Sequence, residues 1–237
     1  QLVQEMAPAK RREIISIAII IFVFRAMPSF GPGAQWWQID VLGFDEAFFG
    51  TLRQIASLLA IAGMFALRSW MGRHPVPYLV VFLAVYQTLM IMPFIGMYYG
   101  LHEWTAAHFG FGARTIAIID TMADSPMGQV AMITMLAWIA KEAPRDKKAT
   151  YFAVMAAFTN LALSASQLGT NYLNKIFPIP RGQYEELGAL MITATVMALI
   201  LPIITVFIFN NPFRQKITPA AVALEMETPS ASSSAKT

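Results

Sequence analysis

Six stretches of about 20 mostly apolar residues recur along the chain, and they constrain its fold more than any other feature of the sequence. A helix of that length crosses a hydrocarbon core about 30 Å thick. Inside such a core, each backbone N–H and C=O must be satisfied within the segment, so we expect helices. The six predicted spans cover approximately residues 13–36, 47–67, 76–98, 115–140, 149–173 and 187–209.

The composition agrees with a protein built inside a membrane. Hydrophobic residues make up 57% of the chain and charged residues only 13%, whereas a soluble domain carries about 25% charged residues. The net charge of +3 is weak evidence for nucleic-acid binding, and the absence of cysteine excludes thiolate nucleophiles and thiolate-ligated metals. We therefore predict an all-α, multi-pass membrane protein surrounded by lipid, with no nucleic-acid partner and no cofactor.

The basic residues predict how the chain is oriented. Eleven Lys and Arg fall at one set of span ends and only three at the other. Because cytoplasmic loops carry the excess of Lys and Arg, both termini are predicted to be cytoplasmic, in a plasma or inner membrane. The eleven are Lys10, Arg11, Arg12, Arg68, Arg73, Lys141, Arg145, Lys147, Lys148, Arg214 and Lys216, and the three are Arg114, Lys175 and Arg181.

Three regions follow from these spans. Residues 1–12 form a cytoplasmic segment, 13–210 the transmembrane domain, and 211–237 a cytoplasmic tail whose Ser, Ala and Pro content predicts disorder. Residues 98–112 are rich in aromatics and contain His102 and His108, which suits an interfacial segment at the outer surface. The six-residue spacing of these histidines does not place two ligands on one helical face, so no metal site is predicted.

The first span contains an arginine and then breaks its own helix. Counting inward at ~1.5 Å per residue places Arg25 about 18 Å into the membrane, near the midplane. Pro28, Gly31, Pro32 and Gly33 follow. Irregular backbone at that depth is tolerated only where it is buried in protein or lines a watery cavity, and a charge there needs the same shelter. We interpret Arg25 and the break as parts of one internal polar site that binds substrate.

The fourth span repeats this pattern in the opposite direction. Asp120 and Asp124 precede a Pro-x-Gly break at Pro126. Arg25 lies about as far from the cytoplasmic end of its span as Asp124 lies from the outer end of its own. Two inverted three-helix repeats predict such a correspondence, and paired Pro/Gly breaks are typical of transporter binding sites.

The two carboxylates lie one helical turn apart, so they share a face and repel each other. In a low-dielectric site, burial and like charge both favour protonating one of them. We therefore predict that Asp120 and Asp124 couple the protein to protons. The alternative is a fixed structural ion pair with Arg25 or Arg53, or a hydrated outer helix end for Asp120.

Three further residues are candidates for substrate binding. Asn160 and Gln167 are polar residues within the fifth span, which is otherwise rich in small and apolar residues. Their alternative role is a hydrogen bond between packed helices. Trp37 could stack on a planar ligand, although a Trp at an outer helix end is also typical of an interface anchor.

Several segments together resemble one transporter family. They are "MPSFGPGAQWWQIDVLGFDEAFFGTLRQIASLLAIAG", "SPMGQVAMITMLAWIAKEAPRDKKATYFAVMAAFTNLALSASQLGTNYLN" and "YEELGALMITATVMALILP". Over about residues 13–210 the chain is similar to the carboxyl-terminal half of folate-biopterin transporters, which belong to the major facilitator superfamily. The resemblance implies one six-helix half bundle whose cavity Arg25, Asp120, Asp124 and Asn160 would line.

The resemblance also implies a function and a partner. The chain would be half of a proton-coupled carrier of folates, pterins or similar planar anions, completed by an amino-terminal six-helix half or another membrane subunit. The alternative is a non-transporting accessory or assembly subunit of a larger membrane complex. An intramembrane enzyme is not predicted, because both acids share one helix and all three histidines lie in loops.

Overall fold

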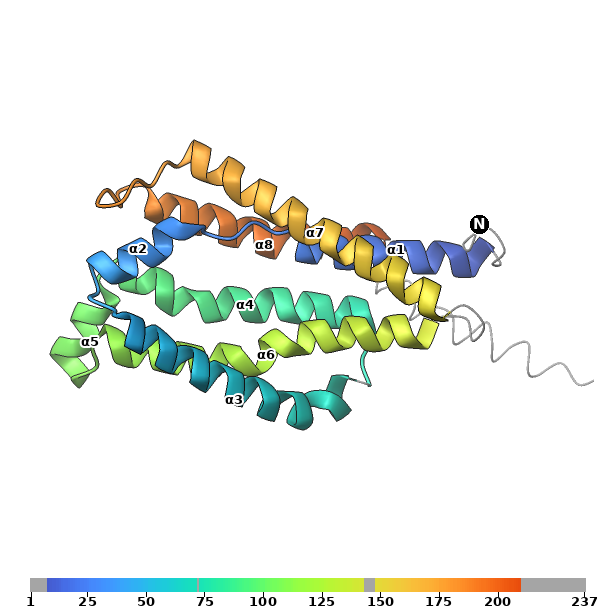
Figure 1. Cartoon of the computed structure of the whole chain (residues 1–237), viewed down its shortest axis with the longest axis horizontal. Helices are drawn as coiled ribbons and strands as arrows, with labels where there is room; N and C mark the ends of the chain where they lie inside the picture. The colour runs from blue at the N-terminus through green and yellow to red at the C-terminus, as the bar shows by residue number, and fades with distance from the viewer. Residues whose placement is uncertain (1–7, 72, 143–147, 210–237) are drawn as a thin grey trace, which may run out of the picture.

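The computed structural model describes residues 8–71, 73–142 and 148–209, and this part of the chain is helical without strands (Figure 1). The predicted all-α class is therefore confirmed. The predicted disordered tail, 211–237, lies outside the described residues. The helices are α1 (Pro8–Arg25), α2 (Pro32–Asp40), α3 (Glu46–Met71), α4 (Val76–Tyr98), α5 (Leu101–Phe109), α6 (Ala113–Glu142), α7 (Lys148–Ile176) and α8 (Leu187–Phe209).

Within the described residues, four helices are long and apolar enough to cross a membrane, namely α3, α4, α7 and α8. They coincide with four of the six predicted spans, so a polytopic membrane protein is confirmed. The remaining two predicted spans correspond to the pair α1 and α2 and to α6. The apolar part of α1, Ile14–Arg25, is short, whereas α6 extends over 30 residues. The helix break predicted at Pro126 is wrong, because α6 continues through that proline. The six-span count stays a prediction.

The first predicted span is two helices and a connecting break. The chain leaves helical geometry after Arg25 and resumes it at Pro32. Proline suits the first position of a helix, because it has no N–H to leave unsatisfied there and its φ is already helical. Gly31 precedes it with φ of 74°, a left-handed conformation that an L-residue with a Cβ rarely adopts.

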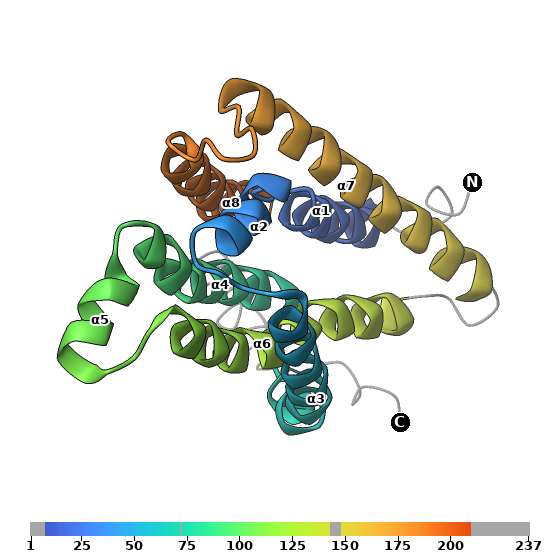
Figure 2. The same cartoon turned by 60° about the vertical axis from the view of Figure 1, so that its left-hand side comes forward.

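The helices pack in pairs around α4. The closest association is between α3 and α6, while α4 lies against α8 on one side and α6 on the other. α1 lies against α8, α7 and α4, and α7 runs along the outside of α1 (Figures 1 and 2). α3 and α7 therefore lie at opposite margins of the bundle, and the break between α1 and α2 lies near its centre.

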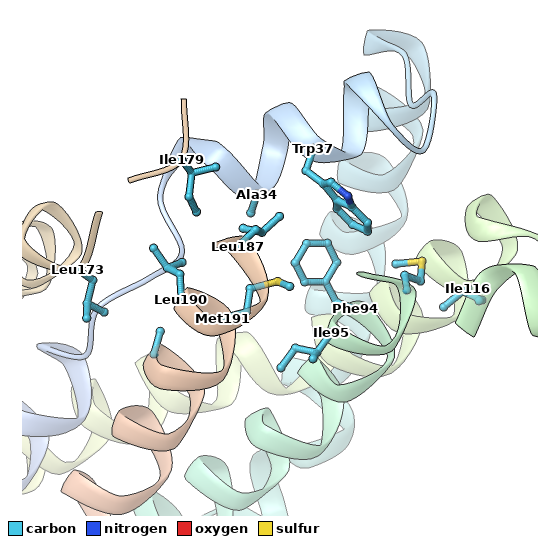
Figure 3. Packing of buried hydrophobic residues seen from close by; sticks show 12 residues of the cluster. Ala34, Trp37, Phe94, Ile95, Ile116, Leu173, Ile179, Leu187, Leu190 and Met191 are labelled. Carbon is cyan, nitrogen blue, oxygen red and sulfur yellow. The ribbon is translucent and has the colours of Figure 1, made fainter. Parts of the chain in front are cut away.

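The main hydrophobic core lies at the end of the bundle where α2, α4 and α8 meet. Trp37 of α2 sits over Phe94 of α4, with Leu190 and Met191 of α8 beside them (Figure 3). The rings of Trp37 and Phe94 meet edge to face at 5.8 Å. This core fixes the second half of the broken span against two helices that pack together.

The predicted interfacial segment is the short helix α5, which lies between two left-handed glycines, Gly100 and Gly110. None of its residues is buried, and Trp104 and Phe109 are exposed. Exposed aromatic rings at a helix end suit the boundary between lipid and water.

Candidate functional site

The backbone of the break is held by three polar side chains of α7. The Ser166 hydroxyl donates to the Met27 carbonyl at 2.6 Å, and the Ser29 N–H donates to the Thr170 hydroxyl at 2.9 Å. Asn174 donates from Nδ2 to the Phe30 carbonyl at 3.4 Å. Because a broken helix leaves backbone groups unsatisfied, such partners are needed at membrane depth.

These three side chains are spaced four residues apart, so they form one stripe along α7. We call Ser166, Thr170 and Asn174 the brace. Close packing accompanies it: a Cβ added to Gly169 would lie 3.4 Å from the Pro28 Cβ, and one added to Gly31 would lie 2.7 Å from Asn174 Nδ2. The brace and the break therefore form one packed unit.

Arg25 ends α1, immediately before the break. Its Nε is buried and has no hydrogen-bond partner. Among the residues that the structure describes, Arg25 forms no ion pair. A guanidinium that is partly buried without a counter-charge is costly in a low-dielectric environment, because the lost hydration is not replaced.

The carboxylates of Asp120 and Asp124 lie one turn apart on α6, as predicted. Asp120 is half-buried, and its Oδ1 has no hydrogen-bond partner, whereas Asp124 is exposed. Nearby, the Tyr86 hydroxyl of α4 donates to the Ala123 carbonyl at 2.6 Å, within electrostatic range of both carboxylates. Neither carboxylate pairs with Arg25 or Arg53 in the described part of the chain, so the structure does not contain the fixed ion pair considered as the alternative.

The other candidate residues are uncharged and belong to α7 and α2. Asn160 and Gln167 are exposed on α7. Trp37 is only 4% exposed and packs against Phe94 and Tyr98 in the core. The structure thus places Arg25 beside the break and the two carboxylates on a separate helix, while Trp37 belongs to the packing of α2.

A cavity of about 190 Å³ lies between the break, α4 and α8. The sequence prediction missed it, since it depends on segments far apart in the chain. Gln87, a lone glutamine in the otherwise apolar sequence of α4, was the available signal for this cavity. The cavity is lined by Pro28, Ser29, Phe30, Ala84, Gln87, Thr88, Ile91, Ala194, Thr195 and Ala198.

Comparison with known proteins identifies the family of this chain. The BT1 family matches residues 1–226. The chain belongs to the BT1 family. This protein is also similar to the curated folate-biopterin transporter of Synechocystis sp., with 22% identity over 194 residues. The resemblance predicted from the sequence is thereby confirmed.

The match covers 82% of the chain and 38% of the Synechocystis relative, so this BT1 family protein spans less than half the length of that relative. No solved structure matches the chain.

An ionic contact joins the carboxyl-terminal end of α2 to the α7–α8 loop of the BT1 family protein. Arg181, in the α7–α8 loop, donates from Nε and Nη2 to the two oxygens of Asp40, at 3.2 and 3.1 Å. The Tyr184 hydroxyl donates to the same carboxylate at 2.5 Å. These bonds, led by that of Arg181, hold the pKa of Asp40 below its ordinary value of 3.8. The carboxylate therefore stays ionised, and α2 stays tied to the loop, throughout the neutral range.

Proposed function

We propose that this BT1 family protein is one half of a secondary active transporter for anionic, planar solutes and that protons drive it. One observation supports this most directly: Arg25 Nε and Asp120 Oδ1 are both buried without hydrogen-bond partners, in helices that are predicted to cross the membrane. Unpaired charged groups are expensive there, so such residues usually serve a substrate or ion pathway. A solute anion would satisfy the first group and a proton the second.

Each charged residue has a distinct role in this proposal. The Arg25 guanidinium binds a solute carboxylate through two parallel hydrogen bonds, a geometry that its planar fork favours. Asp120 and Asp124 exchange the coupling proton, because two carboxylates one turn apart repel when both are ionised. Tyr86 of α4 lies beside these acids, because its hydroxyl donates to the Ala123 carbonyl of α6.

The uncharged candidates have supporting roles. Asn160 and Gln167 are exposed on the same helix that carries the brace, so they offer hydrogen bonds to a solute beside the break. Trp37 is buried among apolar residues, which favours a role in positioning α2 over direct stacking on the solute. A second six-helix half, in the same protein or another subunit, would complete the transport cavity that Arg25 and the two carboxylates are proposed to line.

The test is transport by the native protein that contains this chain, purified and reconstituted in liposomes. We expect an imposed pH gradient to drive accumulation of radiolabelled folate or biopterin, and we expect a protonophore to abolish that accumulation. Equal uptake with and without the gradient would remove proton coupling. No uptake of any planar anion, together with stable co-purification of other membrane proteins, would favour the accessory role instead.

A further inference from the structure

The cavity beside the break has a wall from each of three segments. Residues 28–30 close one side. α4 contributes four residues, Ala84, Gln87, Thr88 and Ile91, and α8 contributes three, Ala194, Thr195 and Ala198. An engineered cavity of about 150 Å³ holds benzene, whereas sites for drug-sized ligands measure about 300–1,000 Å³. At about 190 Å³, this cavity has room for one flat ring system and not for a whole large solute.

Gln87 gives the cavity a hydrogen-bonding edge. The large apolar residues Val85, Leu89 and Met92 are exposed along one side of α4, as lipid contact requires. Gln87 is also exposed, but it lies two positions from both Val85 and Leu89, about half a turn away on the opposite side of the helix, where it lines the cavity. In the part of the chain that the structure describes, its amide has no hydrogen-bond partner, so both its donors and its acceptor are available.

The remaining polar groups of the cavity are acceptors without charge. The Thr88 and Thr195 hydroxyls donate to the Ala84 and Met191 carbonyls of their own helices. Their oxygen lone pairs remain available to a ligand. No charged side chain lines the cavity, so a carboxylate or an ammonium would enter it without a counter-charge, at high cost.

The apolar walls favour a flat ligand. Phe30 lines the cavity, and its ring is nearly parallel to that of Phe94, with centroids 6.0 Å apart. Opposite the break, small residues, Ala84, Ala194 and Ala198, leave the space open. A ring that enters is therefore contacted by an aromatic side chain held in place by its own neighbour, while the amide of Gln87 meets its edge.

We propose that this cavity binds an uncharged, flat ring system that carries adjacent N–H and C=O groups on one edge. The ring would be the neutral part of a solute whose charged part binds elsewhere. Only this second statement rests on the proposed function; the binding itself does not require transport. The Gln87 amide pairs with adjacent donor and acceptor atoms of the ring, as amide groups do with one another.

Occupancy of this site is linked to the break, because Ser29 belongs to both. Its backbone N–H is held by Thr170 of the brace, and the residue lines the cavity. A ligand in the cavity therefore contacts the segment that joins α1 to α2. Any rearrangement of that segment changes the site, and ligand binding favours the arrangement that contains the site.

The experiment measures equilibrium binding of radiolabelled quinazolin-4-one, a neutral bicyclic ring with a lactam edge, to the purified native protein in detergent. Naphthalene is the comparison probe without the edge. We expect Gln87→Leu to weaken quinazolinone binding about tenfold, since it removes two neutral hydrogen bonds, and to leave naphthalene binding unchanged or tighter. Ala198→Leu, which fills the cavity, should abolish binding of both probes.

Two matched variants control for general effects. Gln54→Leu makes the same change at an exposed position of α3, and Ala189→Leu does so at an exposed position of α8; both should bind quinazolinone as the unmodified protein does. Absence of quinazolinone binding, or equal binding in Gln87→Leu, overturns the proposal even where Ala198→Leu does not fold. The assay involves no gradient, so selective binding without uptake would refute the transport proposal and leave the binding site standing.

Discussion

Gly63 of α3 crosses Pro126 of α6 so closely that a Cβ at position 63 would lie 2.6 Å from the Pro126 Cα. The contact belongs to the most closely associated helix pair of the bundle. Since glycine has no side chain, it lets two helix backbones approach at the point where one of them contains a proline. Pro126 also follows Asp124 by two residues, so this crossing fixes the part of α6 that carries the carboxylates.

Gly63→Ala should therefore destabilise the protein, because the added methyl group meets backbone rather than a movable side chain. The expected loss in free energy of unfolding is about 1–3 kcal/mol, as for other overpacked sites, measured as a lower Tm in detergent. Gly50→Ala is the control on the same helix, since a Cβ there has nothing within 4 Å. Equal Tm values for the two variants would contradict the close crossing.

Removing a brace hydroxyl should loosen the break. Ser166→Ala leaves the Met27 carbonyl without its 2.6 Å partner, and an unmade buried hydrogen bond costs about 1–3 kcal/mol. We expect a lower Tm and reduced uptake in the same variant. Ser164→Ala serves as the control, because that hydroxyl donates only to Asn160 of its own helix. If Ser166→Ala behaves like Ser164→Ala, α7 does not support the break.

Changing Arg25 separates charge from geometry. Arg25→Lys keeps the positive charge but loses the planar fork, so solute affinity should fall, and Arg25→Ala should lower it about tenfold or more. Equilibrium binding of folate measures both. Because Arg25 has no ion-pair partner among the described residues, Arg25→Ala should leave the Tm nearly unchanged.

The opposite result has a clear signature. A large fall in Tm for Arg25→Ala, restored by the double change Arg25→Ala with Asp124→Asn, would mean that the two residues stabilise each other in a state that the structure does not show. Arg53→Lys, at an exposed position of α3, controls for general effects of the substitution.

Neutralising Asp124 should uncouple transport from the pH gradient. Asp124→Asn removes the exchangeable proton while preserving size and hydrogen bonding, so accumulation against a gradient should stop while exchange of solute across the membrane continues. Counterflow and pH-driven uptake, measured on the same liposomes, distinguish the two. Glu103→Gln, on the exposed helix α5, should retain both activities, and full accumulation by Asp124→Asn would exclude that residue from coupling.

The orientation of the chain has a direct test. A reporter fused after Lys148 should be cytoplasmic, and one fused near Gly110 should be external, because the basic loops are expected to stay inside. A phosphatase whose folding requires disulfides is active only outside the cytoplasm, so phosphatase fusions and cytoplasm-dependent fluorescent fusions give opposite signals for the two sides. Reversed readings would overturn both the orientation and the pairing of loops on which the six predicted spans depend.

The spans could be predicted because each is a local run of apolar residues. The predicted stretches 76–98 and 187–209 coincide with α4 and α8, and the break before Pro32 was expected from the prolines and glycines around it. In contrast, the brace depends on the rotation of α7 relative to a segment about 140 residues away, and no local pattern encodes that register.

The charged residues show the same division. That Asp120 and Asp124 share a helix face follows from their spacing, whereas their lack of an ion pair with Arg25 depends on how α1 and α6 are placed. Trp37 was expected at an interface or against a ligand because aromatic residues are common at both. Its burial against Phe94 requires α2 to fold back over α4, which only the tertiary structure shows.

Because of the brace, the stiffness of the first span depends on residues of another helix. In an unbroken helix, the backbone hydrogen bonds form within the segment, so the rigidity of the helix depends on its own sequence. Between residues 26 and 31, the hydrogen bonds that limit bending are made with side chains of α7. Substitutions in α7 can therefore harden or soften a hinge in a helix that they never alter. In related proteins, the flexibility of this joint will follow residues 166, 170 and 174 as closely as the prolines and glycines of the joint itself.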